Sequence, residues 1–416
     1  MRFIIRAQPF APALLVAITG LCFQCQAQAD PPWGYKDLGS LDGSFIGPVP
    51  PSVTGTVIGQ AFAAKGGGGS FSYSGDSVSD LGSLGGPSTF FVNGAGGVAG
   101  HSNNGGTTEN RAFVYTSGRL TDVGTLGCSS SQVTGLNASG QVTGYSDTPG
   151  NASSRAFLYS GGKLSDLGTL GGSYSVASGI NDAGQVVGSA YTAGDANSHA
   201  FLYSAGSMSD LGTLGGSTSF ASAINNSGVV IGDSYLDGNA ANHAFMYSNG
   251  QMTDIGTLGG SRSTAVAINR AGQVIGNAYT TGDAATRAFT YSGGKLTDLG
   301  TLGGTNSFAL GINSWGDIIG TSDVAGDTAR HSFLFTGGKM LDLSALFPGL
   351  TNFVADGIND AMQIIGTAVS KSGLVRGLIV TPVPEPEGDW MALAGLGALG
   401  AFAYLRRKRS AAGVSA

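Results

Sequence analysis

The sequence predicts an all-β protein in which one four-stranded unit is repeated along most of the chain. The stretch HAFLYSAGSMSDLGTLGG at 199–216 returns 44 residues later as HAFMYSNGQMTDIGTLGG. Of the 416 residues 72 are glycine and only 11% are charged, a composition typical of short strands joined by tight turns. Because a four-stranded unit of about 40–45 residues has the size of one propeller blade, we expect a β-propeller.

A recurring Asp-Leu-Gly step sets the repeat. Its aspartates follow one another at intervals of 42 to 44 residues: Asp37, Asp80, Asp122, Asp166, Asp210, Asp254, Asp298 and Asp342. The chain enters this series at a second strand, 35–41, and leaves it at a first strand, 376–380. We therefore expect about eight four-stranded blades, with the N- and C-terminal strands completing one blade and closing the ring. A count of seven stays open, because prolines and a glycine run interrupt the first two units.

Each unit contains four expected strands, at 199–203, 208–214, 220–224 and 229–235 in the copy that begins with His199. Ala205 and Gly206 form the turn between the first two strands, since a two-residue hairpin turn needs positive φ at both positions. This register places Asp210 opposite Phe201 and diagonally across from His199. We predict a cation–carboxylate pair, or a shared polar network, repeated around the array, and the same positions hold His243 with Asp254 and Arg287 with Asp298.

The sequence carries no recognised motif for catalysis, metal binding or a cofactor, and we predict none of these. Three of the four histidines share a repeat position that holds arginine in other units, and arginine cannot replace a metal ligand. The in-phase tyrosines Tyr159, Tyr203, Tyr247 and Tyr291 are expected in the core, with stacking on sugars as the alternative. The in-phase aspartates Asp195, Asp283 and Asp327 are expected in solvated turns, with a ring of ligand-binding loops as the alternative.

The charge of the chain argues against nucleic acid as a partner. The formal net charge is −6, and all 26 acidic residues lie between the basic groups at the two termini. Binding to phosphates needs clustered lysine and arginine, which this acidic body does not offer.

The N-terminal residues 1–29 predict a signal peptide that is removed by signal peptidase. Arg2 and Arg6 supply positive charge, an apolar run follows at 10–23, and Ala27 and Ala29 supply small residues at the cleavage positions. An unprocessed N-terminal helix is the alternative.

The C-terminal segment 381–416 predicts a sorting tail. The step Val383-Pro384-Glu385-Pro386 precedes an uncharged apolar run at 390–405, expected to be a transmembrane helix, and then the basic end Arg406-Arg407-Lys408-Arg409, expected in the cytoplasm. This three-part order resembles the PEP-CTERM signal of Gram-negative bacteria. The resemblance implies cleavage near the Pro-Glu-Pro step by an exosortase-type membrane protease, in a bacterium that makes an extracellular polysaccharide. A permanent membrane anchor is the alternative.

The repeat region 30–380 resembles the bacterial HAF extracellular repeat family. The resemblance is carried by His199-Ala200-Phe201, His243-Ala244-Phe245 and the TDLGTLGG segments. It implies exported repeat proteins, with no molecular activity assigned.

Together these patterns predict an exported protein, tethered to the inner membrane before processing and then at the cell surface or outside the cell. Our first hypothesis is a non-enzymatic binding or structural component of the cell surface or exopolysaccharide matrix, with extracellular polysaccharide as a partner. The alternatives are a propeller-based polysaccharide hydrolase or lyase, and an adhesin.

Overall fold

The computed structural model describes residues 33–38, 43–49, 57–63, 68–74, 77–80, 88–93, 96–103, 109–116, 118–151, 153–347 and 350–382. The predicted signal peptide, transmembrane helix and basic end lie outside the described residues. Residues 35–381 form one compact unit. Within the described ranges, no helix is long and apolar enough to cross a membrane.

Strands β1 to β32 make up almost all of this unit, and consecutive strands pair into four-stranded antiparallel sheets. In chain order the sheets hold β2 (Gly43–Val49), β3 (Val57–Ala63), β4 (Gly68–Ser74) and β5 (Ser77–Asp80); β6 (Ser88–Val92), β7 (Val98–Asn103), β8 (Asn110–Thr116) and β9 (Arg119–Asp122); β10 (Ser131–Leu136), β11 (Val142–Asp147), β12 (Ser154–Ser160) and β13 (Lys163–Asp166); and β14 (Gly171–Ile180), β15 (Val186–Thr192), β16 (Ser198–Ser204) and β17 (Ser207–Asp210).

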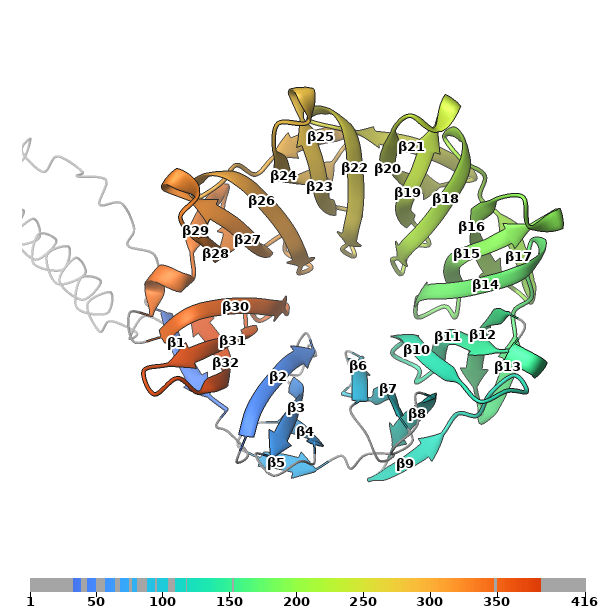
Figure 1. Ribbon diagram of the computed structural model, residues 1–416, viewed down its shortest axis with the longest axis horizontal. Coiled ribbons are helices and arrows are strands. Elements are labelled where there is room, and N and C mark those ends of the chain that lie inside the picture. The colour runs from blue at the N-terminus through green and yellow to red at the C-terminus, as the bar shows by residue number, and fades with distance from the viewer. Residues whose placement is uncertain are drawn as a thin grey trace, which may run out of the picture. The chain divides into compact units, whose positions relative to one another are not determined.

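The second half of the chain continues this order. Its sheets hold β18 (Gly215–Ile224), β19 (Val230–Leu236), β20 (Asn242–Ser248) and β21 (Gln251–Gly256); β22 (Gly259–Ile268), β23 (Val274–Thr280), β24 (Thr286–Ser292) and β25 (Lys295–Asp298); and β26 (Gly303–Ile312), β27 (Ile318–Val324), β28 (Arg330–Thr336) and β29 (Lys339–Asp342). One parallel pairing, Asn242 with Arg262, joins the sheets of β18–β21 and β22–β25. Figure 1 shows the sheets around a common centre, each with its first strand innermost, as in a propeller.

The last sheet takes its strands from both ends of the chain. It holds β30 (Leu350–Ile358), β31 (Ile364–Ser370), β32 (Val375–Pro382) and, beside β32, β1 (Trp33–Asp37). The amide of Leu38 donates to the carbonyl of Gly377 at 2.9 Å, and Arg376 pairs with Asp37 at 2.9 Å. The predicted pairing of the two terminal strands is therefore confirmed.

Short 3-10 helices occupy several loops between the second and third strands of a sheet. These are η1 (Pro149–Asn151), η2 (Ala193–Asp195), η3 (Asp237–Asn239), η4 (Thr281–Asp283) and η5 (Ala325–Asp327), and η6 (Ser344–Leu346) follows β29. In four of these loops the third residue has positive φ, as Asp195 does at 55°. Asp195 is exposed in a turn, as the sequence predicted, and its carboxylate accepts hydrogen bonds from the amide and hydroxyl of Ser173 at 2.7 and 2.9 Å.

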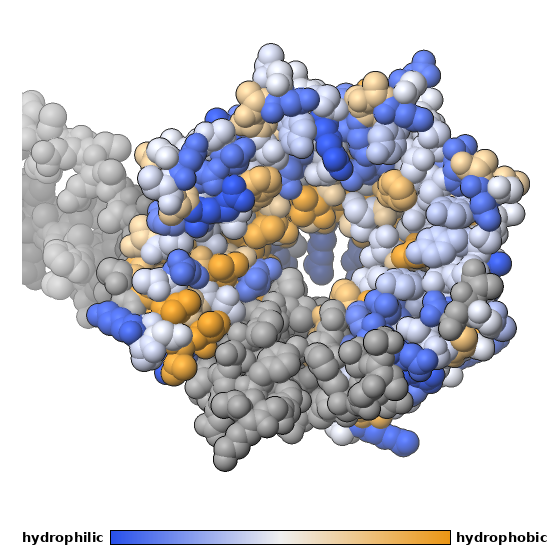
Figure 2. Space-filling model, viewed as in Figure 1, coloured by the Kyte–Doolittle hydropathy of each residue, from blue (hydrophilic) through white to orange (hydrophobic). Residues whose placement is uncertain are grey.

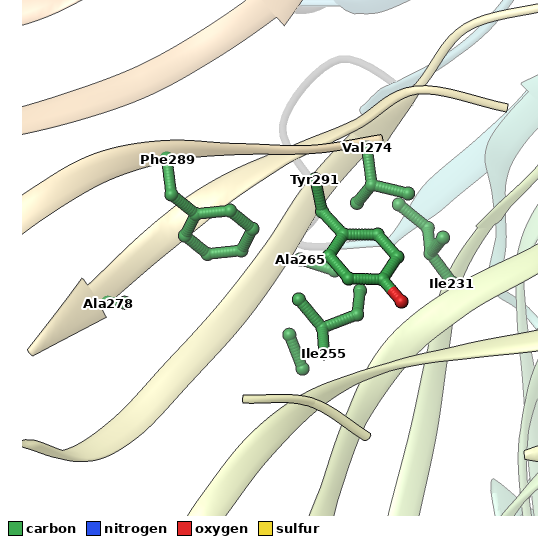
Figure 3. Close-up of a cluster of buried hydrophobic side chains, with 8 residues drawn as sticks. Ile231, Ile255, Ala265, Val274, Ala278, Phe289 and Tyr291 are labelled. Atoms are coloured by element: carbon green, nitrogen blue, oxygen red, sulfur yellow. The ribbon is translucent and has the colours of Figure 1, made fainter. Parts of the chain in front are cut away.

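The core consists of side chains buried between neighbouring sheets. Figure 3 shows one cluster, in which Ile231 and Ile255 meet Val274, Phe289 and Tyr291 from the next sheet. Tyr291 is 8% exposed, and its in-phase counterparts pack against equivalent clusters: Tyr159, Tyr203 and Tyr247. The expectation that these tyrosines belong to the core is confirmed. Burial of such side chains stabilises each by about 1.5–3 kcal/mol.

Side chains that are identical in successive units join the sheets to one another. The amide of Asn225 donates to the carbonyl of Asn269 at 3.1 Å, one repeat further on. The same bond recurs from Asn93 to Asn137, Asn137 to Asn181, Asn181 to Asn225, Asn269 to Asn313 and Asn313 to Asn359. Gly276 is equally constrained, because a Cβ there would collide with the carbonyl of Thr264 and the ring of Phe289. These contacts form a uniform frame.

Two strand boundaries differ from the prediction. The second strand of the unit, β17, ends at Asp210 rather than at 214, and the third, β18, begins at Gly215 rather than at 220. Gly215 has a φ of 107° and pairs with Leu236, ahead of a register shift at Ser219. The Gly-Gly step therefore lies inside a strand, because glycine permits both this φ and the close approach of β19.

Candidate functional site

The residues singled out from the sequence form a structural element of each hairpin. Phe201 lies opposite Asp210, as the register predicted, and His199 Nδ1 lies 2.8 Å from the Asp210 carboxylate. His243 with Asp254 repeats this geometry at 2.8 Å. Asp210 also accepts a hydrogen bond from the amide of Gly212 at 2.7 Å, which fixes the chain after β17.

Arg287 is the exception to this pairing. No ion pair joins it to Asp298 in the described part of the chain, and its Nε is buried without a hydrogen-bond partner. Asp298 still accepts the amide of Gly300 at 2.8 Å, so the carboxylate keeps its role in the turn. The processing residues Ala27, Ala29, Val383 to Pro386 and Arg406 to Arg409 lie outside the described residues.

A different set of residues distinguishes one unit from the next. In the unit of β22–β24 these are Arg262, Thr264, Asn277, Tyr279 and Thr286. The equivalent residues in other units lie at steps of 44 along the sequence. The position of Arg262 is occupied by Ser130, Tyr174, Thr218 and Asn306, that of Thr264 by Gln132, Val176, Phe220 and Phe308, and that of Asn277 by Tyr145, Ser189, Asp233 and Thr321. The position of Tyr279 is occupied by Asp147, Tyr191, Tyr235 and Asp323, and that of Thr286 by Ser154, Ser198, Asn242 and Arg330. We call these positions the variable face.

The strand geometry places the variable face on one side of each sheet. Side chains at i and i+2 of a strand share a face, so Arg262 and Thr264 point the same way. Thr264 lies directly opposite Asn277, and Tyr279 lies directly opposite Thr286. Residues between them, such as Ser263 and Ala265, are the same or similar in every complete unit and are buried. Each unit thus offers a constant side and a varied side.

Side chains of the variable face contact one another within and between units. The rings of Tyr174 and Tyr191 lie 5.3 Å apart between centroids. Burial raises the pKa of the Tyr174 phenol, and the nearby Tyr145, Tyr191 and Asp147 add to this rise. These aromatic groups come from two neighbouring sheets, so the surface that they form spans the junction.

A second contact group lies on the unit of β26–β28. Arg330 Nε donates to Asp323 at 2.8 Å, and the Arg330 guanidinium lies over the Phe308 ring, 4.7 Å from its centroid. Asn306 donates to the same carboxylate at 2.9 Å. The hydrogen bond from Arg330 holds the pKa of Asp323 below its usual range. Asp323 is therefore an ionised, fully engaged group of this surface.

Asp233 has the opposite environment. Its Oδ1 accepts a hydrogen bond from the amide of Ala265 at 2.9 Å, across the junction with the next sheet. Burial raises its pKa to about 6, and the hydrogen bond and the charge of Arg262 offset part of that rise. At the equivalent place in the next unit, Asn277 accepts from Ala309 at 2.8 Å without any charge.

Two cavities open along this surface. One has a volume of about 220 Å³ and is lined by Arg262, Thr264, Asn277, Tyr279, Thr286 and Phe308. All six occupy variable positions. The other, of about 470 Å³, is lined by residues of the next junction that include Arg330, His331 and Asn352. Figure 2 shows apolar side chains on the inner border over β26 and β30, beside polar ones further out. Among the described residues, no group of three or more His, Cys, Asp or Glu could hold a metal ion.

The sequence prediction missed the variable face because it rested on residues that are the same in every unit and not on residues that differ between units. Aligning the units at 44-residue steps would have shown five strand positions that differ while their neighbours stay constant. Residues also differ between units directly after the asparagines that join the sheets, at Asp182, Asn226 and Arg270. There Asp182 and Asn226 bond to each other across the junction at the far end of the first strand.

Comparison with solved structures finds matches at low sequence identity. The β-propeller domain of the Trilobed protease from Pyrococcus furiosus has 8% identity and a TM-score of 0.49, over 72% of this chain and 97% of that chain. Porphyromonas gingivalis dipeptidyl peptidase 4 has 12% identity and a TM-score of 0.47, over 79% of this chain and 57% of that chain. TolB from Acinetobacter baumannii has 12% identity and a TM-score of 0.34, over 65% and 60%.

Comparison with curated protein sequences finds no match. Residues 382–408, however, match the PEP-CTERM protein-sorting motif. This match begins at Pro382, where β32 ends. A motif of this kind implies export and processing by exosortase, a membrane protease. The chain is therefore an exported protein that joins an all-β, propeller-like repeat unit to a C-terminal PEP-CTERM sorting motif.

Proposed function

We propose that this protein is a non-enzymatic binding component of the cell surface or exopolysaccharide matrix, and that the variable face is its binding surface. The observation that carries the proposal is the contrast within each sheet. Residues that hold the sheets together are constant between units, whereas five neighbouring positions on the opposite side differ in size, charge and aromatic character. Clustered variation on a constant frame is typical of repeat proteins that present an extended binding surface.

The chemistry of the variable face favours a polysaccharide. Aromatic rings such as Tyr191, 37% exposed, and Phe220, 43% exposed, offer flat apolar surfaces. Asn277, Thr264 and Tyr279 hold variable positions of another unit, and their amide and hydroxyl groups can donate and accept hydrogen bonds. Ligand sites combine apolar walls with a few placed polar groups in this way.

The proposed pathway to the outside uses both termini. Signal peptidase removes residues 1–29, the segment 390–405 tethers the protein to the inner membrane, and exosortase cuts near Pro384-Glu385-Pro386. The HAF-type repeat body then reaches the cell surface or the exterior as an eight-bladed ring closed by β1 and β32. The pairing of β1 with β32 supports this closure.

One observation favours the alternative of a polysaccharide hydrolase or lyase. Asp356 lies on β30, and its Oδ2 is buried with no hydrogen-bond partner in the described part of the chain. Burial raises the pKa of this carboxyl group to about 6. A carboxylic acid with such a pKa is suited to general acid catalysis.

The test is binding of the purified protein to a glycan panel that includes the exopolysaccharide of the producing organism. We expect binding without shortening of the polysaccharide. A variant in which Phe220 and Tyr235 are replaced by serine, the residue type found at several variable positions, should bind more weakly. A matched control replaces Asn226, at the other end of the strands, and should bind normally. If the wild type shortens the polysaccharide and Asp356→Asn does not, the protein is an enzyme and our proposal is wrong. If Asp356→Asn shortens the polysaccharide as well, the activity comes from a contaminant. Capture of proteins and of no glycan would instead indicate an adhesin.

A further inference from the structure

We propose that the 220 Å³ pocket between β22–β24 and β26 binds an acidic sugar residue of a polysaccharide, with Arg262 as the partner of the sugar carboxylate. This inference rests on the proposed function and specifies the class of residue that one junction of the variable face recognises.

The size and walls of the pocket suit a single sugar ring. Its volume is about 220 Å³, below the roughly 300–1,000 Å³ of sites for drug-sized ligands. Phe308 forms one wall. Its ring also packs against the Arg330 guanidinium at 4.7 Å, which holds the ring in place from β28 of the same sheet. A fixed aromatic wall provides the apolar surface on which the C–H groups of a pyranose can pack.

The polar groups of the pocket are also held in position. Asn277 Oδ1 is occupied by the amide of Ala309 at 2.8 Å, so its Nδ2 is the group left to donate to a ligand. The amide of Thr286 donates to Asn306 Oδ1 at 2.9 Å, which leaves its hydroxyl for the pocket. Together with Tyr279, these side chains supply the mixed donors and acceptors that sugar hydroxyls require.

Arg262 gives the pocket its charge preference. The residue is exposed, and within the described ranges no carboxylate lies within 4.0 Å of its guanidinium. The charge of Arg262 acts on Asp233, whose pKa it lowers, but Asp233 Oδ1 is bonded to the amide of Ala265 and the two side chains form no ion pair within 4.0 Å in the described ranges. A guanidinium binds a carboxylate through two parallel hydrogen bonds, which a neutral sugar cannot provide. A uronic acid in the pocket would therefore supply the direct ion pair that Arg262 does not make with the described part of the chain.

The next pocket along the surface favours a polymer over a free sugar. Arg330, which packs on Phe308 in the first pocket, also lines the 470 Å³ cavity at the following junction, together with Leu350 and Asn352. The two cavities are thus consecutive, and the Phe308–Arg330 contact lies between them. A chain of sugars can occupy both, so the affinity of linked residues exceeds that of one residue alone.

The experiment compares polygalacturonate with its methyl ester, which has the same sugar ring without the charge. Full-length protein in mild detergent is titrated with each polymer. We expect Arg262→Gln to weaken binding of polygalacturonate at least about tenfold, since one hydrogen-bonded charge contact is lost, and to leave binding of the ester unchanged. The matched control Arg270→Gln removes the same charge from the turn that follows β22 and should bind like wild type. Phe308→Leu should weaken binding of both polymers.

Each other outcome has a definite meaning. Equal binding of polygalacturonate and its ester by the wild type, or an equal loss in Arg270→Gln, would overturn the assignment to this pocket. Binding of neutral glycans alone would also overturn it while the proposed binding function stands. If no glycan binds at all, the proposed function fails together with this inference.

Discussion

Asp233 offers a direct test of how the variable face is built. It accepts the amide of Ala265 at 2.9 Å, and Asn277 makes the same bond to Ala309 at 2.8 Å in the next unit. The substitution Asp233→Asn should therefore keep the hydrogen bond and remove only the charge. We expect this variant to be more stable than the wild type at neutral pH.

The expected gain follows from the pKa of Asp233. Burial raises it from 3.8 to about 6, so the folded protein holds the proton more tightly than the unfolded chain. Stability of the wild type then falls as pH rises from about 4 to about 6, and stays lower above that window. At 1.36 kcal/mol per pKa unit, the ionised carboxylate costs at most about 3 kcal/mol. The variant should gain up to that amount at about pH 7.5 and nothing at about pH 4.

The assay is denaturant unfolding of both proteins at about pH 4, 5, 6 and 7.5, which spans the window in which the proton is lost. All other titrating groups are shared, so the difference between the two curves isolates this position. The reverse substitution, Asn277→Asp, is the matched control and should lose stability over the same pH window. A difference that does not change with pH, or a variant that is less stable at neutral pH, would refute the reasoning.

Three further predictions concern the frame and the tail. Asn225→Ala should lower the free energy of unfolding, measured by denaturation, by at least about 3 kcal/mol. The variant loses the hydrogen bond to Asn269 at 3.1 Å and the hydrogen bonds from the amides of Ser227 and Val229, each at 3.0 Å. Ser227→Ala is the control. Arg376→Gln should lower the free energy of unfolding by no more than about 1 kcal/mol, because the ion pair with Asp37 is partly exposed. Deletion of 375–382 should instead leave the N-terminal strand without its partner, so that limited proteolysis cleaves it rapidly. Replacing Pro384-Glu385-Pro386 by alanines should yield a larger, membrane-retained product on a blot, and normal size and release would contradict the role of this step.

The sequence predicted local pairing well, because hairpins are determined by neighbouring residues. Positive φ at Ala205 and Gly206, 51° and 86°, fixed the register that brings His199 to Asp210. The start of β18 could not be predicted in this way. Gly215 pairs with Leu236, a partner 21 positions away, and the Gly-Gly step has the composition of a turn although it lies in a strand.

The candidate site was harder to predict because its residues share no chemistry. Arg262, Tyr174 and Asn306 occupy the same place in three units, and only their position on the sheet relates them. The 44-residue spacing relates these places in the sequence, but the pocket also needs Phe308 from the next unit. Packing between units, which depends on how each sheet meets its neighbour, decides what the pocket contains.

The pairing of β1 with β32 has a consequence for how the protein reaches its folded state. It joins residues 339 positions apart, whereas the described sheets between them are built from strands that follow one another along the chain. Closing so long a loop is slow, and a chain exported from its N-terminus delivers β1 first and β32 last. Until then β1 is an unpaired edge, which is a risk for aggregation. The strand is only five residues long and carries the charges of Lys36 and Asp37. Both features disfavour pairing of β1 with another chain before β32 is available.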